Sequence, residues 1–562
     1  MSLFSELTAD LLCREIGIPS SSIVLNAAGK FTIVAPNTDK TRKAIVAVET
    51  RANEWLMEMS FGENAIGLSF IEASAEDFVH AKFSELWDNL AKNMEKKKCK
   101  KIDLECFGGA VSGYLDNFRN DLGHPLCPFC GKRPSAHEVE GSALVGENES
   151  ACKICRDHIF LGTNLVKKDR LAITSVDADI KGDDTRLLEP IFGYYQVAFV
   201  DGGMKDMARA GKLLKYWDIS IDPEGRVSKD VTAKFINGYV PTYREEDLND
   251  DRLLAGKKSE AKKQDLINQL NEGAPKTFGH IANKALNVRE NGKGFCGIEA
   301  LGVLKADVDQ LGLLMSCGLK PERFTLSRLA TLSRQLDWYF TLYLPHLLKT
   351  NPQFMDIYTV FAGGDDLFLI GPWNRVIELV GLLRQTFAEY VCHNQEIHFS
   401  AGISLHKPHT PLDKLAERAE AALGKSKTVD EGRRNRITLF SETVQWDQYI
   451  RLKEIRDILQ RWYDKKLINN AMIYRLNDFI RMADTERVIL EREEIHLDDM
   501  QCLKWHALFD YTAQRNVGKG LKGKEKEEMV REFSKAAVWL KEYGGTLKLA
   551  HWNIIYNQRK EA

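Results

Sequence analysis

The chain has 562 residues, of which 44% are hydrophobic and 28% are charged. This length and balance predict roughly two to four globular domains and exclude a disordered, fibrous or disulfide-stapled small protein. The 78 Lys and Arg against 80 Asp and Glu give a net charge of −2. A uniformly basic nucleic-acid-binding surface is therefore excluded, whereas local basic areas remain compatible with the charge.

No stretch of the sequence reaches the roughly 20 apolar residues that span a bilayer, and the first residues do not form a signal peptide. We therefore expect a cytosolic protein. The 11 cysteines are an odd number and favour metal binding in a reducing compartment over a disulfide framework.

The first hundred residues alternate between helix and strand patterns. Helices are predicted over 3–16 and 40–59, a β-hairpin over 23–34 and a strand over 66–71. A lysine run at 96–101 follows, and it is interpreted as a solvated face or as a contact with RNA or a protein partner.

The remainder changes character three times. Short aromatic and β-branched runs over 169–243 predict more strand than helix, and the polar residues 244–271 predict a connector. The apolar run "IEALGVLKADVDQLG" predicts a buried strand that stops at carboxylates. Beyond Phe440, amphipathic segments predict a helical domain that continues to the end.

An internal repeat relates two hairpins. "IVLNAAGKFTIVAP" (23–36) aligns with "YTVFAGGDDLFLIGP" (358–372), and in each copy the hairpin is followed by a predicted helix and strand. The repeat predicts two related βαβ modules, that is, two palm domains, because the matching downstream elements make a chance alignment of a short hairpin unconvincing.

Asp307 and the run Gly363-Gly364-Asp365-Asp366 form the sharpest functional pattern. Glycines suit a tight hairpin turn, and carboxylates clustered at its tip repel one another unless a cation lies between them. Mg²⁺ or Mn²⁺ at such a site would neutralise a triphosphate during attack of a hydroxyl on its α-phosphorus. An exposed acidic turn is the alternative interpretation.

Cys127-Pro-Phe-Cys130 and Cys152-Lys-Ile-Cys155 have the spacing of a four-thiolate Zn²⁺ site. Such a site would stabilise a segment that has little apolar core. His124, His137 and His158 lie nearby, and we expect none of them to be a ligand because four cysteines complete a tetrahedral site.

The segments "LKADVDQLG", "FTLSRLATLSRQLDWYF", "FAGGDDLFLIGPW", "FSAGIS" and "GRRNRITLF" resemble the second palm of the large subunit of type III-A (Csm-type) CRISPR-Cas effector complexes. This palm is related to GGDEF diguanylate cyclases. The resemblance extends through the cysteine segment, "FGYYQVAF", "FINGYVP" and "KTFGHIANKA" and covers almost the whole chain.

The resemblance implies an α+β fold with four parts. These are a degenerate first palm (1–100), a zinc-binding segment (101–168), a second palm with its N-terminal extension (169–440) and a helical C-terminal domain (441–562). The implied activity is the conversion of ATP into cyclic oligoadenylate at a metal-bound GGDD site when the complex binds target RNA. The implied partners are guide RNA, target RNA, the subunit that caps the 5′ end of the guide, a small helical subunit that docks on the C-terminal domain, and the backbone subunits.

The resemblance also implies roles for individual residues. The metal ligands are Asp307 and Asp366, with Asp365 as a supporting carboxylate, the Val308 carbonyl as a further ligand and Asp309 as a less certain one. The nucleotide contacts are Gly363, Gly364, Ser333, Arg334, Lys425, Lys427 and, from the first palm, Lys30. For the three lysines a solvated surface position is the alternative, and for Ser333 it is packing.

The chain departs from the family pattern in three ways. In the first palm, Gly29 and Lys30 replace the two aspartates, so that palm is not expected to bind a catalytic metal. None of the 13 histidines is followed by aspartate, and no HD nuclease domain precedes the first palm, so single-stranded DNase activity is not expected from this polypeptide. The opening strand of the first palm is not found either, which predicts an unpaired strand edge, or a strand from elsewhere, beside residues 23–36.

Two other functions stay open. A diguanylate cyclase would share the metal site, although the Asp-Asp tip of the hairpin, the zinc segment and the degenerate first palm disfavour it. A catalytically silent scaffold that binds guide RNA and partner proteins would keep the fold without the chemistry. The lysine cluster 519–526 is interpreted as a solvated loop or a contact with RNA.

Overall fold

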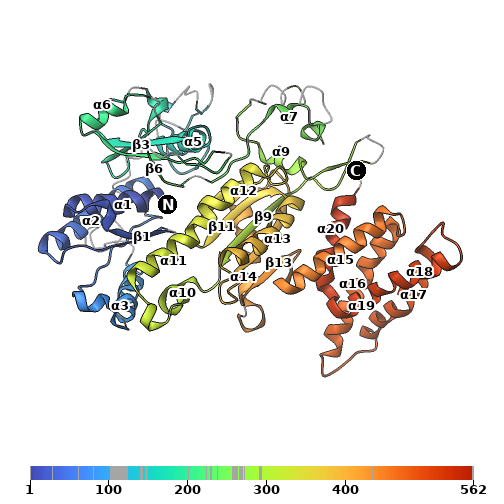
Figure 1. Cartoon of the computed structure of the whole chain (residues 1–562). Helices are drawn as coiled ribbons and strands as arrows, with labels where there is room; N and C mark the ends of the chain where they lie inside the picture. The colour runs from blue at the N-terminus through green and yellow to red at the C-terminus, as the bar shows by residue number, and fades with distance from the viewer. Residues whose placement is uncertain are drawn as a thin grey trace. The chain divides into compact units, whose positions relative to one another are not determined.

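The structure is a computed structural model, shown in Figure 1. It describes residues 2–559, except for 28, 61, 80, 101–124, 140–143, 146–149, 181, 200–201, 223, 228–230, 237, 256–263, 265–269, 271, 290–293 and 433. The chain divides into two compact units. The first comprises Met1–Tyr239, Gln310–Thr350 and Gly363–Asp365, and the second comprises Val240–Asp309, Asn351–Ala362 and Asp366–Ala562. Among the described helices, none has the length and apolar character needed to span a membrane.

The first unit begins with the predicted helix, hairpin and helix. They are α1 (Ser2–Ile16), β1 (Ile23–Ala27), β2 (Lys30–Ile33) and α2 (Asp39–Ser60), followed by α3 (Ala81–Lys98). The four-residue spacing of Leu7 and Leu11 gives α1 an apolar face, which packs with Ala44 and Val48 of α2 in one core. These elements confirm the helix and hairpin predictions.

The predicted strand over 66–71 is wrong, because these residues join no sheet. The β1–β2 sheet has two strands, so in the described part of the chain both of its outer edges are unpaired, as expected. In the second unit the corresponding strand, β12 (Phe399–His406), pairs with the central strand β9 (Leu301–Val308). The first module has no counterpart of β9 among its described residues, so residues 66–71 have no strand to pair with.

A second sheet of the first unit has the strand order β4-β3-β5-β6. Its members are β3 (Arg170–Ser175), β4 (Tyr195–Ala198), β5 (Leu213–Asp218) and β6 (Thr232–Ala233), with α6 (Met204–Arg209) between β4 and β5. This confirms the prediction of more strand than helix in this region. Leu171, Ile173 and Val197 share the core of α1 and α2, together with Phe160 of α5 (Lys153–Lys167).

Four consecutive helical segments complete the first unit. They are α10 (Leu311–Cys317), α11 (Leu326–Trp338), a π-helical turn (Tyr339–Tyr343) and α12 (Leu344–Thr350). Leu329 of α11 packs against Leu25 of β1 and Phe83 of α3, so this helix shares a core with the first hairpin. The π-helical turn interrupts an otherwise continuous helix, and such turns are often found at functional sites.

The second unit is built on a six-stranded sheet in the order β10-β11-β9-β12-β13-β14. Its members are β9, β10 (Tyr358–Gly363), β11 (Asp366–Pro372), β12, β13 (Arg436–Leu439) and β14 (Glu442–Gln445). β9 is antiparallel to both β11 and β12, as in a palm with a central first strand. The predicted buried strand and the predicted hairpin are both confirmed.

Two glycines explain how helices cover both faces of this sheet. A side chain at Gly302 would meet the backbone of Trp373 in α13 (Trp373–Tyr390), and one at Gly402 would meet the backbone of Leu423 in α14 (Leu412–Gly432). Gly402 pairs with Lys305, which points to the opposite side of β9 from Gly302. The helices α13 and α14 therefore pack closely on opposite faces, with α14 on the face of Lys305 and Asp307.

The last part of the chain is helical, but its helices begin later than predicted. Residues 442–445 form β14, because Phe440 and Ser441 both have positive φ and make the tight turn that folds β14 back on β13. The following helices are α15 (Trp446–Asp464), α16 (Asn470–Leu490), α17 (Trp505–Asn516), α18 (Lys524–Phe533), α19 (Lys535–Tyr543) and α20 (Lys548–Gln558). The indole of Trp446 donates to the Phe399 carbonyl at 2.9 Å and so ties α15 to β12. Lys524–Lys526, which was interpreted as part of a loop, is the first turn of α18.

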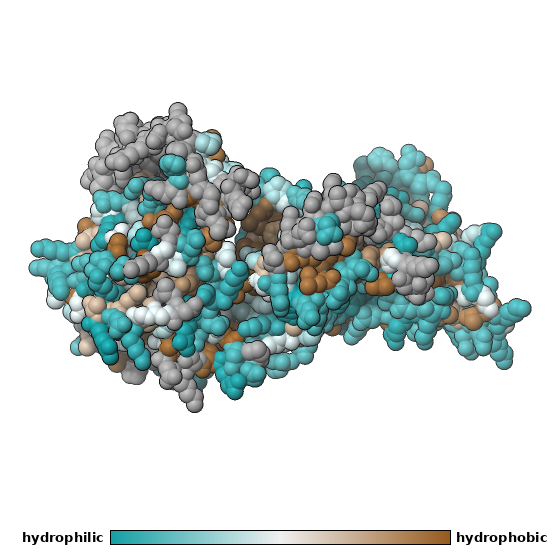
Figure 2. Space-filling model, turned by 90° about the horizontal axis from the view of Figure 1, so that it is seen from above, coloured by the Kyte–Doolittle hydropathy of each residue, from teal (hydrophilic) through white to brown (hydrophobic). Residues whose placement is uncertain are grey.

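The remaining short elements are α7 (Glu245–Leu248), α9 (Phe278–Asn283), β7 (Asn287–Val288) and β8 (Phe295–Cys296). Ile281 and Ala282 of α9 pack against Val303 and Ile370, so α9 covers the same face of the sheet as α14. On the surface, Figure 2 shows hydrophilic residues over most of the face in view, interrupted by small apolar areas.

Candidate functional site

Asp307 and Asp366 lie directly opposite each other on neighbouring strands. Asp307 is near the end of β9, Asp366 is the first residue of β11, and the antiparallel register pairs them. Side chains at paired positions project from the same face about 5 Å apart, and two like charges there destabilise the sheet unless a cation lies between them. The pair therefore has the chemistry of a site for a hard divalent cation, which prefers carboxylate oxygens.

A lysine occupies part of this site in the structure. Lys427 of α14 places its Nζ 2.5 Å from Oδ1 of Asp307, and each side chain is about a quarter exposed (23% and 27%). Lys425 is exposed and lies two positions earlier on the same helix, so it points about 160° away around the helix axis. Of the two lysines of α14 that are predicted to contact the nucleotide, the structure brings Lys427, and not Lys425, to the carboxylates.

A second lysine on the same strand face adds positive charge. Lys305 pairs with Glu420 of α14. Burial alone would lower its pKa, but the hydrogen bond to Glu420 and the charge of Asp366 raise it. Lys305 is therefore a fixed cation beside the carboxylate pair.

Asp309, the less certain predicted ligand, is fully engaged by the protein. Its buried carboxylate accepts hydrogen bonds from the Ser400 hydroxyl (2.8 and 2.9 Å), the Asn435 amide (3.0 Å) and Nδ1 of His398 (2.7 Å). These contacts join the end of β9 to β12 and to the turn before β13. A carboxylate with this many donors is a structural tie, since few lone pairs remain for a metal.

The glycines of the GGDD motif form the tight turn that the sequence predicts. Gly363 ends β10 and Asp366 begins β11, so the loop has two residues, Gly364 and Asp365. Gly364 has φ +67° and Asp365 has no positive φ, which is the pattern of a type II′ hairpin turn with glycine first. The Gly364 amide donates to Oδ1 of Asp337 at 2.8 Å.

The other predicted site residues lie on α11, β2 and β9. Ser333 and Arg334 are on α11, and the Arg334 guanidinium lies 6.0 Å from the centre of the Trp338 ring. Lys30 is exposed at the start of β2, where it pairs with Ala27 of β1. Val308 ends β9 with its side chain buried. The roles assigned to these residues stay predictions.

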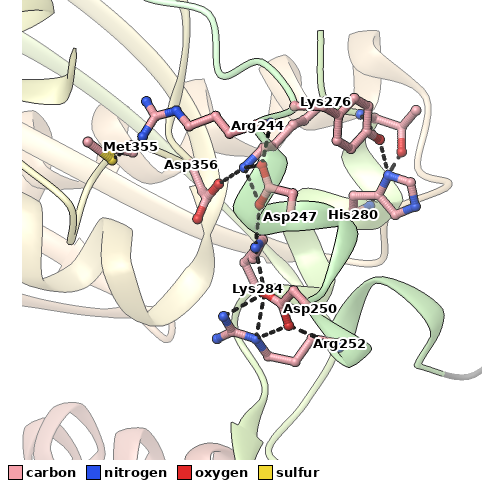
Figure 3. A network of polar contacts seen from close by, with 11 residues as sticks. Arg244, Asp247, Asp250, Arg252, Lys276, His280, Lys284, Met355 and Asp356 are labelled. Atoms are coloured by element: carbon pink, nitrogen blue, oxygen red, sulfur yellow. Dashed lines mark hydrogen bonds and ion pairs between the residues drawn. The ribbon is translucent and has the colours of Figure 1, made fainter. Parts of the chain in front are cut away.

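A buried ionic network supports the residues that lead into β10 (Figure 3). Lys276 bridges Asp247 (2.7 Å) and Asp356 (2.6 Å), and Asp356 lies two residues before β10. Lys284 bridges Asp247 (2.6 Å) and Asp250 (2.5 Å), and Asp250 also pairs with Arg252 at 2.7 Å. Three carboxylates thus balance three cations, which is the condition for charges to be buried without a large penalty.

The four cysteines converge in the first unit. The sulfur atoms of Cys127, Cys130, Cys152 and Cys155 all lie within 4.8 Å of one another, and those of Cys130 and Cys152 are 3.9 Å apart. Zinc–sulfur bonds of about 2.3 Å in a tetrahedron put sulfur atoms about 3.8 Å apart, so the residues fit Zn²⁺. His137 and His158 are not in the cluster, and His124 is outside the described residues.

Two site residues were not predicted from sequence. Asp337 lies in "TLSRQLDWYF", which was assigned to the nucleotide pocket through Ser333 and Arg334 alone. Lys305 lies in "LKADVDQLG", where its two-residue spacing from Asp307 already indicated that both side chains share one strand face. No local signal in the sequence indicated that Asp337 reaches the Gly364 amide.

Two families of known proteins match parts of this chain. The family model "Cas10/Cmr2, second palm domain" matches residues 300–438, and "Csm1 subunit domain B" matches residues 1–106. Two similar proteins carry the name "CRISPR system single-strand-specific deoxyribonuclease Cas10/Csm1 (subtype III-A)". That of Methanocaldococcus jannaschii is 24% identical over 81% of this chain and 56% of its own length, and that of Enterococcus italicus is 23% identical over 86% and 56%. The chain therefore spans little more than half the length of these relatives.

Solved structures share the fold. A Csm1-Csm4 cassette in complex with pppApApA matches 99% of this chain and 65% of the solved chain, with a TM-score of 0.62 and 18% identity. Cassettes in complex with cA4 and with one ATP match with TM-scores of 0.63 each, at 17% and 18% identity, and cover 99% and 100% of this chain and 65% and 66% of the solved chains. The family models match the palm and N-terminal regions, and together with the relatives and the shared fold they support a large subunit of the Cas10/Csm1 type.

Proposed function

We propose that this chain polymerises and cyclises ATP into cyclic oligoadenylate, with release of pyrophosphate, at a divalent metal site formed by Asp307, Asp365 and Asp366. The observation that carries the proposal is the cross-strand pairing of Asp307 with Asp366 beneath Lys427. It is supported by the solved Csm1-Csm4 cassettes of the same fold, which are in complex with one ATP, with pppApApA and with cA4.

The acidic residues are proposed to hold the metal, and the lysine is proposed to contact the phosphates. Bound Mg²⁺ or Mn²⁺ would neutralise the triphosphate and the developing charge on the leaving pyrophosphate. Asp307, Asp365 and Asp366 would hold the ion, with the Val308 carbonyl as a further oxygen ligand. Lys427 would move from Asp307 to a phosphate oxygen, because the arriving metal takes over the neutralisation of the carboxylate. Gly363 and Gly364 would allow the triphosphate to approach the backbone of the turn.

The first palm is proposed to hold the second nucleotide. Lys30 stands at the position that corresponds to Asp366, so this hairpin presents a cation where the second palm presents a carboxylate. A bound acceptor nucleotide would keep its 3′-hydroxyl near the α-phosphate of the other, which raises the effective concentration of the reacting groups. Ser333 and Arg334 are proposed to line the nucleotide pocket.

We further propose that the enzyme works within a cytoplasmic type III-A complex and is switched on by target RNA. A Csm4-type subunit is the first partner proposed, because the structural relatives are Csm1-Csm4 assemblies. A small helical subunit is proposed to dock on the C-terminal helices, where Leu490 (69% exposed) and Leu497 (83% exposed) present apolar side chains to solvent. Structural Zn²⁺ is proposed for the cysteine cluster, and elemental analysis of the purified chain should find one zinc per chain.

The proposal is tested on the reconstituted complex with guide and target RNA. Wild type is expected to convert ATP, but not GTP, into cyclic products in Mn²⁺ or Mg²⁺, as measured by mass spectrometry. Asp365→Ala/Asp366→Ala is expected to abolish the products without loss of RNA binding. Cyclic dinucleotides from GTP would identify a diguanylate cyclase instead, and a wild-type complex that consumes no nucleotide would identify a scaffold.

A further inference from the structure

The first residue of the GGDD turn is held by a carboxylate from a distant helix. In a two-residue hairpin the amide of the first loop residue has no partner in the ladder between the strands. Here that amide, of Gly364, donates to Oδ1 of Asp337 at 2.8 Å. Asp337 and residues 363–365 belong to the same compact unit, so the contact lies within one unit of the fold.

The helix presents two side chains to the turn. Asp337 is in the last turn of α11, and Thr341 follows four residues later in the π-helical turn. The Thr341 hydroxyl donates to the Asp337 carbonyl at 2.9 Å. A methyl group at Gly363 would lie 3.5 Å from Cγ2 of Thr341 and 3.7 Å from Oδ1 of Asp337, which are contact distances. The helix surface therefore lies directly against both glycines of the motif.

The surroundings of Asp337 favour its hydrogen bond with the Gly364 amide. Burial raises its pKa, whereas the Gly364 amide, the charge of Lys234 and the Thr341 hydroxyl lower it. In the described part of the chain, no lysine or arginine nitrogen forms an ion pair with this carboxylate within 4 Å. A half-buried carboxylate without a paired cation is costly, and the charge-assisted bond to the backbone amide offsets part of that cost.

We propose that Asp337 is a positioning residue for the metal-binding turn. Its carboxylate accepts the hydrogen bond of the Gly364 amide and so fixes the backbone conformation of the turn. The turn conformation then sets the positions of Asp365 and Asp366. A divalent ion such as Mg²⁺ requires its ligands in nearly ideal octahedral geometry, so a looser turn weakens metal binding and slows the chemistry. This inference rests on the proposed function, because it assigns Asp337 to the same metal site.

The test compares Asp337→Ala with Asp337→Asn in the reconstituted, target-bound complex. Asparagine keeps an oxygen acceptor for the Gly364 amide, whereas alanine removes it. Asp337→Ala is expected to lower kcat about tenfold or more and to raise the Mn²⁺ concentration needed for half-maximal turnover, with KM for ATP little changed. Asp337→Asn is expected to restore most of both. Thr331→Ala, at an exposed position of α11 whose hydroxyl contacts only its own helix, is the matched control and should behave as wild type.

Hydrogen exchange provides a readout that does not depend on turnover. The peptide that spans 358–370 is expected to exchange faster in Asp337→Ala than in wild type or Asp337→Asn. If the wild-type complex makes no oligoadenylate, the proposed function fails, while exchange and Mn²⁺ binding still test Asp337. The inference is overturned if Asp337→Ala needs the same Mn²⁺ concentration as wild type for half-maximal turnover and its 358–370 peptide exchanges hydrogen at the wild-type rate. It is also overturned if Asp337→Asn is as defective as Asp337→Ala, because the charge rather than the hydrogen bond would then be responsible.

Discussion

At the scale of single residues, two aspartates that lie only two positions apart have different surroundings. Asp307 and Asp309 both follow the alternation of β9, yet Asp309 is saturated by Ser400, His398 and the Asn435 amide, whereas Asp307 meets a single lysine. The difference arises because β12 and the turn before β13 supply donors only at Asp309. A carboxylate whose partner is one partly exposed lysine is the one that a metal can take over.

Lys427 should therefore matter more for nucleotide than for metal. Lys427→Ala removes the cation from Asp307 and from the proposed phosphate contact, and a lost hydrogen bond to a charged group costs about 1.5–3 kcal/mol. We expect kcat/KM for ATP to fall about tenfold to a hundredfold. The Mn²⁺ concentration for half-maximal turnover should not rise, because the lysine competes with the ion for Asp307.

Steady-state kinetics at several Mn²⁺ concentrations measure this change. Lys414→Ala is the matched control, because Lys414 is an exposed residue of the same helix that pairs only with the neighbouring Glu417. Wild-type kcat/KM in Lys427→Ala would contradict the prediction.

At the scale of elements, the two hairpins show how a strand depends on its neighbour. β12 is a strand because β9 offers it a full antiparallel ladder. Residues 66–71 have a similar apolar pattern, but side chains of α2 take over the role of a ladder. Asn53 both accepts from the Ile66 amide and donates to the Ile66 carbonyl, each at 2.8 Å, and the Glu49 carboxylate accepts from the Leu68 amide.

Asn53→Ala is expected to destabilise the first unit. It leaves two half-buried backbone groups of Ile66 without their partner, which should lower the free energy of unfolding by about 1–3 kcal/mol. Thermal unfolding of the purified chain measures the loss, and Glu54→Ala, an exposed neighbour on the same helix, is the control. An unchanged midpoint would show that Asn53 does not hold this segment.

At the scale of the whole molecule, buried titratable groups make stability depend on pH. Burial lowers the pKa of both His280 and His551 to about 4. His280 is hydrogen-bonded to Tyr243, and Nε2 of His551 lies 2.6 Å from the Ile473 carbonyl. Both rings are buried in the second unit, where only the neutral form is well accommodated.

The sign of the effect follows from the lowered pKa. A histidine in the unfolded chain binds a proton near pH 6.5, whereas these two buried histidines stay neutral until about pH 4. The folded state therefore keeps its full stability above pH 6.5 and loses stability as the pH falls from 6.5 toward 4. At pH 5 each histidine should lower the free energy of unfolding by about 2 kcal/mol relative to neutral pH. Thermal unfolding at pH 7 and pH 5 measures this, and His280→Gln should show a smaller drop than wild type. The exposed His409→Gln is the control, and an equal drop in all three proteins would contradict the prediction.

The buried ionic network makes stability depend on pH in a second, more acidic range. Burial opposes ionisation of Asp247 and Asp250, but Lys276, Lys284 and Arg252 hold the pKa of these carboxyl groups below its usual range. Their contribution is present above the unfolded pKa of about 4 and is lost as the pH falls below it. Unfolding in acid is thus expected to continue below the range in which the histidines titrate.

The sequence by itself determined the local elements and the chemistry of both metal sites. Alternation and periodicity predicted the GGDD hairpin, β9 and the long helices, because apolar spacing follows directly from strand and helix geometry. The spacing of Cys127, Cys130, Cys152 and Cys155 predicted a cluster that the structure brings together. Only the tertiary structure decided which lysine faces Asp307, that Asp309 is a structural tie, that Asp337 holds the turn and that residues 66–71 are not a strand. Each of these depends on a partner far away in the sequence, and no local pattern records which distant side chain or strand will be adjacent after folding.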